Sequence, residues 1–146
     1  MNISYNELNT DKFFDKVYGC LCGLVIGDCM GMPTEFMTPK DIKNRYGFVE
    51  NLVEPGKDHI HNDMSKGMIT DDSEVTIEII KEIIKCKKIN LEVAVNALKN
   101  WAIEKDIFNK SYLGPNSAKA IKKLLEGADP IEAGKYGTTI GAAMRV

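Results

Sequence analysis

The sequence predicts an all-α fold, and three observations support that class. Apolar residues recur with a period near 3.6 over several segments longer than ten residues, which is the pattern of amphipathic helices. Alternating apolar and polar runs, typical of half-buried strands, are nearly absent. Residues that cap or end helices bracket the periodic segments: Asn90 precedes one of them and Gly127 follows another.

Composition and charge bound the function classes that remain open. The chain has 146 residues, of which 44% are hydrophobic and 27% charged, and its net charge is −2. These values are typical of one globular domain, so we expect a single domain over residues 1–146 or the N-terminal part of a larger one. They exclude a disordered chain and a broadly basic nucleic-acid binder.

Two further features of the sequence indicate the cellular compartment in which the protein is expected. The polar start, MNISYNELNT, lacks the apolar core of a secretory signal. The four cysteines have no paired C-x-x-C spacing, so neither a disulfide framework nor a zinc site is expected. We therefore expect free thiols and a cytoplasmic protein.

The first helix is expected from about Lys12 to Met30, and Pro33 follows its end. The most apolar stretch, residues 17–32, is interrupted by Asp28 and by glycines and is about 16 residues long, short of a membrane span. We therefore expect a buried helix and no membrane partner. A glycine recurs at every fourth position of this helix, at Gly23, Gly27 and Gly31. These glycines leave a strip without side chains, where another helix or a ligand could approach.

The rest of the chain predicts several helices and one long irregular segment. Residues 33–69 form the irregular segment, with one short helix expected from Pro39 to Tyr46, and a loop this long is usually functional or held down by partners. Further helices are expected over residues 72–88, 90–104, 116–126 and 130–134. Trp101 lies at helical spacing and is expected in the core rather than stacked on a base.

The last residues, from Ile140 to Val146, have the pattern of the opening turns of a buried helix. A helix this short is marginal alone. We therefore expect that the chain is part of a longer protein, or that a second copy or another chain packs against this segment.

The sharpest polar motif lies where the helix over residues 72–88 is expected to start. It reads GMITDDSE from Gly67 to Glu74 and places a hydroxyl and two adjacent carboxylates together, at Thr70, Asp71 and Asp72. Mg²⁺ and Mn²⁺ prefer such hard oxygen ligands. The alternative is structural, because Asp71 with Glu74 fits a capping box and first-turn carboxylates are stabilised by the helix dipole. Spacing alone favours this structural alternative.

Two more carboxylates and a histidine pair are candidate site residues. Asp28 lies inside the apolar helix, where a carboxylate costs free energy unless it is paired, hydrogen-bonded or beside a metal. The structural alternative is a buried Asp28 that accepts bonds from loop amides, and Glu35 can equally be a solvated loop residue. The spacing of His59 and His61 could bind a transition metal, although two loop histidines are usually solvated.

Four segments in order resemble successive motifs of the ADP-ribosylglycohydrolase family. They are Gly19 to Phe36, Gly67 to Glu74, Tyr112 to Ser117 and Gly137 to Val146. The resemblance covers almost the whole chain from Phe14 onwards. The chain resembles the N-terminal portion of family members of the dinitrogenase-reductase-activating glycohydrolase type. The resemblance implies a helical orthogonal bundle, incomplete at its C-terminus.

The resemblance also implies an activity, cofactors and partners. Members hold two Mg²⁺ ions, with Mn²⁺ as the alternative, and hydrolyse the glycosidic bond that joins ADP-ribose to a protein side chain or small acceptor. Two cations can bind the ribose hydroxyls, activate water and offset charge as the sugar approaches an oxocarbenium-like state. The expected partner is an ADP-ribosylated protein or an ADP-ribose derivative.

Site residues follow from the same resemblance. The Thr-Asp-Asp set that ligates metal in the family maps onto Thr70, Asp71 and Asp72, and the glutamate by the reacting ribose maps onto Glu35. The implied catalytic residues are Glu35, Asp71 and Asp72. The implied substrate-binding residues are Asp28, Gly114, Asn116, Ser117, Thr138, Thr139 and Gly141.

The chain departs from the family pattern at two places. Ile140 stands where the last motif normally has asparagine, which changes the contacts expected there. The family completes its two-metal site with an Asp-x-Asp-type segment far downstream, so we expect half of the metal shell to lie outside this sequence. Two alternatives therefore stay open: a non-catalytic helical module that binds ADP-ribose or a protein partner, and a helical domain whose Asp71 and Asp72 only cap a helix.

Overall fold

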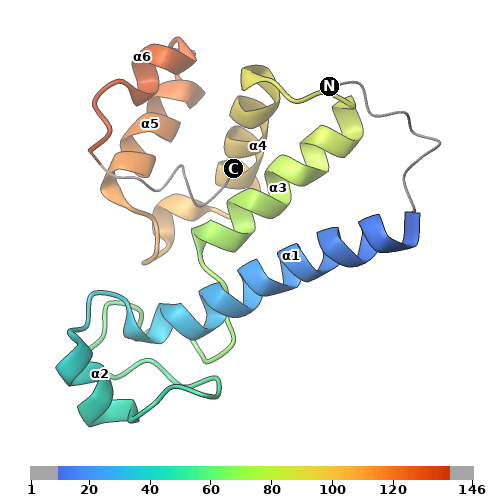
Figure 1. Cartoon of the computed structure of the whole chain (residues 1–146). Helices are drawn as coiled ribbons and strands as arrows, with labels where there is room; N and C mark the ends of the chain where they lie inside the picture. The colour runs from blue at the N-terminus through green and yellow to red at the C-terminus, as the bar shows by residue number, and fades with distance from the viewer. Residues whose placement is uncertain (1–9, 139–146) are drawn as a thin grey trace.

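The computed structural model describes residues 10–138 and confirms the all-α class (Figure 1). Within this part of the chain no strand is present. The elements are α1 (Thr10–Gly31), η2 (Met32–Thr34), α2 (Pro39–Tyr46), α3 (Asp71–Cys86), α4 (Leu91–Glu104), η3 (Ile107–Asn109), α5 (Pro115–Leu125) and α6 (Pro130–Gly134). The helix expected after Ile140 lies outside the described residues.

Local sequence signals account for where these helices begin and end. The Asn90 side chain accepts a bond from the Val93 N–H at 3.0 Å and caps α4. Prolines stand at the first helical position of α2, α5 and α6, where a missing N–H costs nothing. Gly127 follows α5 with φ of +87°, a conformation that glycine adopts without strain. The short η3 turn was not expected from the sequence.

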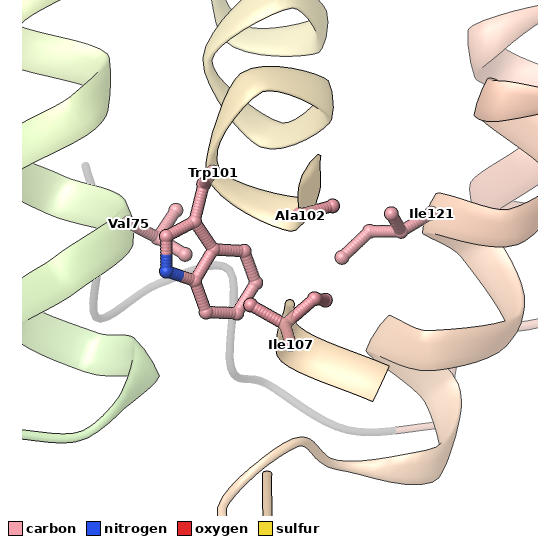
Figure 2. Close-up of a cluster of buried hydrophobic side chains, with 5 residues drawn as sticks. All are labelled: Val75, Trp101, Ala102, Ile107 and Ile121. Carbon is pink, nitrogen blue, oxygen red and sulfur yellow. The ribbon is translucent and has the colours of Figure 1, made fainter. Parts of the chain in front are cut away.

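The core lies where α3, α4 and α5 meet, around Trp101 (Figure 2). Trp101 is fully buried, as expected, and Figure 2 shows its ring lying between Val75 of α3 and Ile107 of η3. Ile121 of α5 and Ala102 complete the cluster. This packing holds the N-terminal end of α3 in a defined place.

The expectation that α1 is buried is wrong for most of its length. The side chains of Val17 and Ile26 are 42% and 57% exposed, whereas Cys29 is buried. Figure 1 shows α1 running out as a long rod, with α3 lying beside only part of it. The C-terminal end is covered because the loop before α3 returns to it, and the Cys29 thiol donates to the Gly67 carbonyl at 3.2 Å.

The apolar segment that includes most of α1 is also longer than the stretch of about 16 residues identified from the sequence. The segment Asp11–Thr34 has 24 residues and contains an 18-residue window with a mean hydropathy of 1.3, so by length and composition it could cross a membrane. Core helices of soluble proteins and signal sequences pass the same test. The absence of a membrane partner therefore stays a prediction.

The long segment between η2 and α3 is held down by its own polar contacts. Arg45 on α2 forms a two-pronged ion pair with Asp58, at 2.7 and 2.8 Å. The Tyr46 hydroxyl donates to the Glu54 carbonyl at 3.0 Å. These contacts tie α2 to the returning chain, which then leads His59 and His61 back toward the end of α1.

Candidate functional site

The acidic motif lies at the N-terminal end of α3, as the sequence predicts, but its cap differs from the one expected. The helix begins at Asp71, and the residue before it, Thr70, accepts a bond from the Asp72 N–H at 3.4 Å. The proposed capping box between Asp71 and Glu74 is therefore wrong. The carboxylate of Glu74 instead turns to the core, because the Trp101 indole donates to it there.

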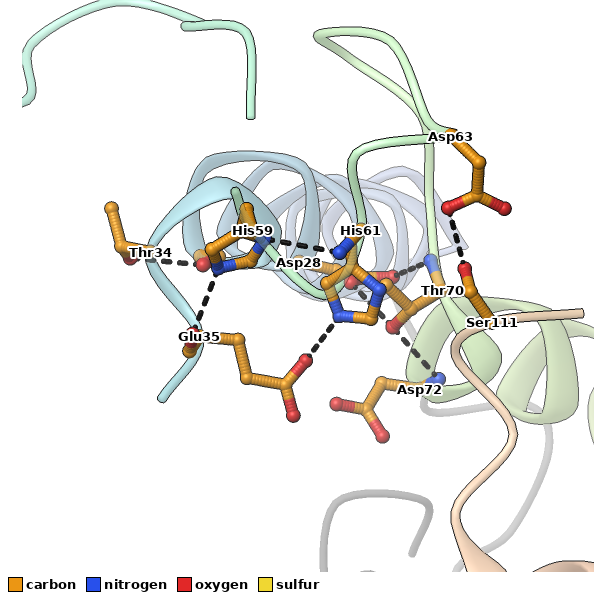
Figure 3. Close-up of polar contacts among 10 residues, drawn as sticks. Asp28, Thr34, Glu35, His59, His61, Asp63, Thr70, Asp72 and Ser111 are labelled. Carbon is orange, nitrogen blue, oxygen red and sulfur yellow. Dashed lines mark hydrogen bonds and ion pairs between the residues drawn. The ribbon is translucent and has the colours of Figure 1, made fainter. Parts of the chain in front are cut away.

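Asp28 from α1 organises the start of α3. One carboxylate oxygen accepts from the Thr70 hydroxyl at 2.7 Å, and the other accepts from the backbone N–H groups of Thr70 and Ser73, at 2.9 and 3.3 Å. The structural alternative for Asp28 is confirmed in its bonds to backbone N–H groups, but the residue is only partly buried. The structure also brings Asp28 and Thr70, two residues assigned by the family resemblance, into direct contact (Figure 3).

The charge of Asp28 also acts on its neighbour Cys29. Burial, together with that charge, raises the pKa of the Cys29 thiol. The thiol is therefore protonated at neutral pH, which agrees with its donation to the Gly67 carbonyl. All four cysteines, which lie in the described part of the chain, are free, as expected.

Glu35 is held by the two histidines rather than being a free loop residue. Its carboxylate oxygen Oε2 lies 2.6 Å from Nε2 of His61, and its backbone carbonyl lies 2.8 Å from Nε2 of His59 (Figure 3). Both imidazoles are buried, with His61 nearly inaccessible. The expectation of solvated loop histidines is therefore wrong, because the loop folds back over the end of α1 and buries them.

A groove with a volume of about 570 Å³ lies beside α1, and residues of α1, Glu35 and the start of α3 line it. One wall is the glycine strip, where an added Cβ at Gly23, Gly27 or Gly31 would meet no atom within 4 Å. Among the described residues the strip is therefore uncovered, and the sequence prediction that another helix or a ligand approaches it stays a prediction. The polar residues that line the groove are Asp28, Glu35, Thr70 and Asp72.

Tyr112 connects the core to the loop that follows η3. Its hydroxyl donates to Glu74 at 3.0 Å, and the neighbouring Ser111 hydroxyl donates to Asp63 at 2.8 Å. Glu74 therefore accepts bonds from two elements and joins α3, α4 and this loop. Burial, then the charge of Glu74 and the bond to it, raise the pKa of the Tyr112 phenol above its ordinary value.

This raised pKa predicts how stability changes at alkaline pH. The unfolded phenol loses its proton near pH 10, so Tyr112 stabilises the fold fully below about that pH and loses this contribution as the pH rises above it. When the pH rises from about 9 to about 11, the unfolding free energy of Tyr112→Phe is expected to fall by less than that of wild type. Urea unfolding at each pH measures this. The exposed Tyr136→Phe is the control, and equal losses in all three proteins would contradict the prediction.

Of the residues expected to line the rest of an ADP-ribose cleft, those that the structure describes do not border the groove. The Asn116 amide donates to the Thr138 hydroxyl at 2.9 Å, which links the start of α5 to the segment after α6. Gly114 is the residue before α5, and Ser117 lies in its first turn. Thr139 and Gly141 lie outside the described residues. The structure thus brings Asn116 and Thr138 together, apart from the groove beside α1.

The oxygen donors at the start of α3 agree in type with a Mg²⁺ site. Thr70 and Asp72 line the groove, and Asp71 adjoins them as the first residue of α3. Over residues 10–138, however, no three His, Cys, Asp or Glu side chains converge as a metal-binding cluster. The two-metal site and its completion by another segment stay predictions.

Comparisons with known proteins agree with the motifs. The sequence model of the ADP-ribosylglycohydrolase family matches residues 9–146. An uncharacterized protein of Archaeoglobus fulgidus is 34% identical over 132 residues, and the uncharacterized protein YegU of Escherichia coli is 29% identical over 134 residues. Each match covers 90% of this chain but 41% and 40% of the relative, so the chain spans about two fifths of their length.

A third relative has a named activity. It is the ADP-ribosyl-[dinitrogen reductase] glycohydrolase of Rhodospirillum rubrum, 32% identical over 65 residues, which are 44% of this chain and 21% of that protein. All three relatives are thus longer than the part that this chain matches.

Proposed function

The chain belongs to the ADP-ribosylglycohydrolase family, and from this premise we propose that it supplies the N-terminal half of a site that hydrolyses an ADP-ribose glycosidic bond. The groove beside α1 is the observation that carries this proposal. There, the half-exposed carboxylate of Glu35 and the Asp28–Thr70 pair lie beside the strip of glycines on α1. A sugar can approach such a strip closely, and carboxylates are the groups that glycoside hydrolysis employs.

The chain's own residues divide the work between binding and proton handling. Asp28 keeps the Thr70 hydroxyl and the first turn of α3 in place, so the polar groups that face the ribose are positioned before it binds. Glu35 has one oxygen engaged by His61, whereas the other, Oε1, has no hydrogen-bond partner among residues 10–138. We propose that Oε1 holds or releases the proton during bond cleavage.

We further propose that Thr70, Asp71 and Asp72 hold Mg²⁺, completed by oxygen ligands from a further segment or chain. Bound there, the ion would bind ribose hydroxyls and offset charge in the transition state. The support is the chemistry of this donor set, since hydroxyl and carboxylate oxygens are what Mg²⁺ prefers.

An ADP-ribosylated protein is the proposed natural substrate. The relative from Rhodospirillum rubrum is named for glycohydrolase activity on ADP-ribosylated dinitrogen reductase, and the matched 65 residues support carrying the ADP-ribosyl part of that activity over. The acceptor can be arginine, serine or an ester, so a panel of ADP-ribosyl-arginine, ADP-ribosyl-serine and acetyl-ADP-ribose is the suitable test set.

The first test is calorimetric titration of ADP-ribose into the 146-residue chain, with and without Mg²⁺. We expect binding that requires Mg²⁺ and is lost in Asp72→Ala. Glu92→Ala is the matched control, because Glu92 occupies the same second position of α4 that Asp72 occupies in α3 and is exposed. A folded chain that binds no ADP-ribose would contradict a usable site in this chain.

A second candidate function is a binding module without turnover. The groove beside α1 supports it as well, because a ligand that lies there need not be cleaved. Turnover of the substrate panel separates the two functions. With the segment or chain that completes the site present, metal-dependent release of ADP-ribose supports the hydrolase, whereas affinity for ADP-ribose without any release supports the module.

A further inference from the structure

We propose that His61 is the positioning residue for Glu35: it holds the carboxylate at the groove in one orientation and leaves one oxygen for the substrate. This inference deepens the proposed hydrolase function and rests on it. Neither histidine belongs to the residues that the family resemblance assigns. The proposal therefore concerns a pair of residues that only the structure brings to Glu35.

The first argument is the contrast in burial across the pair. The side chain of His61 is 2% exposed, whereas that of Glu35 is 47% exposed, and the two are joined by a contact of 2.6 Å. The imidazole is thus fixed by the protein around it, while the carboxylate reaches into the groove. An anchor of this kind restricts a side chain that would otherwise sample several rotamers in solvent.

The second argument is that the backbone of Glu35 is held as well. Nε2 of His59 lies 2.8 Å from the Glu35 carbonyl, and Nδ1 of His59 accepts the His61 backbone N–H at 3.2 Å. Because Nδ1 of His59 accepts, its proton must lie on Nε2, which then donates to Glu35. Main chain and side chain of Glu35 are therefore both tied to the segment from His59 to His61 (Figure 3).

The third argument locates the proton of the His61–Glu35 contact. Nδ1 of His61 is buried and has no hydrogen-bond partner among the described residues. A proton on Nδ1 would be a buried donor without an acceptor, which costs free energy. Two arrangements would require such a proton: a charged His61, and a neutral Glu35 that donates its proton to Nε2 of His61. The remaining arrangement is a neutral His61 whose Nε2–H donates to the Glu35 carboxylate, and such charge-assisted bonds are strong.

Ring-nitrogen NMR tests this contact without any assay of activity. Long-range ¹H–¹⁵N spectra of the whole chain at neutral pH are expected to show His61 as the Nε2–H tautomer. Glu35→Gln is expected to move the Nε2 resonance of His61 and to leave that of His59 in place, because Nε2 of His59 bonds the backbone carbonyl of Glu35 and not its side chain. A His61 in the Nδ1–H form, or an Nε2 resonance that ignores Glu35→Gln, would overturn the proposal.

Turnover of the substrate panel, measured with the segment or chain that completes the site present, tests the consequence for catalysis. His61→Leu is expected to lower kcat by about tenfold to a hundredfold with little change in KM, the scale of a misplaced catalytic group. His61→Gln is expected to recover most of that loss, since its amide N–H can reach the place of Nε2–H. In Glu35→Gln the further change His61→Leu is expected to cost nothing, because the two residues act as one unit.

The outcomes separate this inference from the function on which it rests. Independent, multiplicative losses in the double variant, or no recovery in His61→Gln, would show a merely structural histidine and overturn the proposal. With the segment or chain that completes the site present, a wild type that releases no ADP-ribose from any panel member would count against the proposed hydrolase instead. The ring-nitrogen spectra then decide the His61–Glu35 contact by themselves.

Discussion

Replacing Asp28 by alanine is expected to have the largest effect on the candidate site. The change removes the acceptors of three bonds, two from Thr70 and one from the Ser73 backbone, and leaves their donors in a partly buried place. Bonds to a charged group and unsatisfied donors together make a loss of about 3 kcal/mol in unfolding free energy the expected result. Urea unfolding measures it, and ADP-ribose titration is expected to show no metal-dependent binding.

Two further variants make this prediction specific. Asp15→Ala removes an exposed carboxylate from the same helix and is expected to change neither stability nor binding. Asp28→Asn keeps the shape but turns one acceptor into a donor, so it is expected to lose part of the stability and most of the binding. If Asp28→Ala were as stable as Asp15→Ala, the Asp28–Thr70 contacts would not organise the start of α3.

Trp101→Ala is expected to unfold most of the helical core. Trp101 is 1% exposed and packs between α3 and η3, while its indole N–H donates to Glu74 at 2.8 Å. Losing a buried tryptophan costs about 3–5 kcal/mol, which is a large part of the stability of a domain. Circular dichroism during heating is expected to show a much lower Tm than wild type or no cooperative transition.

The matched control for Trp101 lies two residues further along the same helix. Ile103 is 68% exposed, so Ile103→Ala is expected to change the unfolding free energy by less than about 0.5 kcal/mol. Trp101→Phe keeps part of the ring volume but removes the donor to Glu74, so it is expected to fall between the two alanine variants. Equal stability of Trp101→Ala and Ile103→Ala would contradict the core described for α3, α4 and η3.

The local elements of the fold were accessible from the sequence because their signals lie within a few residues of one another. The helix from Pro39 to Tyr46 and the cap at Asn90 are where they were expected. Apolar periodicity placed Trp101 and Ile121 in the core. The residues of the acidic motif also stand at the start of α3, as their spacing predicts. Each of these features needs only the order of neighbouring residues and the geometry of one helix.

The exposure of α1 was not accessible in the same way. Its apolar composition predicts burial, but composition does not say which elements cover which face. Among the described residues, α3 and the loop at Gly67 cover only part of α1. Side chains such as Ile26 are consequently open to solvent.

The sequence alone was sufficient for the helical class, the helix boundaries to within about two residues, and the family to which the motifs belong. The polar site required the tertiary structure. Asp28 and Thr70 are 42 residues apart, and Glu35 and His61 are 26 apart, yet both pairs are hydrogen-bonded. Sequence periodicity does not predict such pairs, because contacts between residues this far apart depend on how a long irregular segment folds back. That segment is held by many weak contacts that act only together.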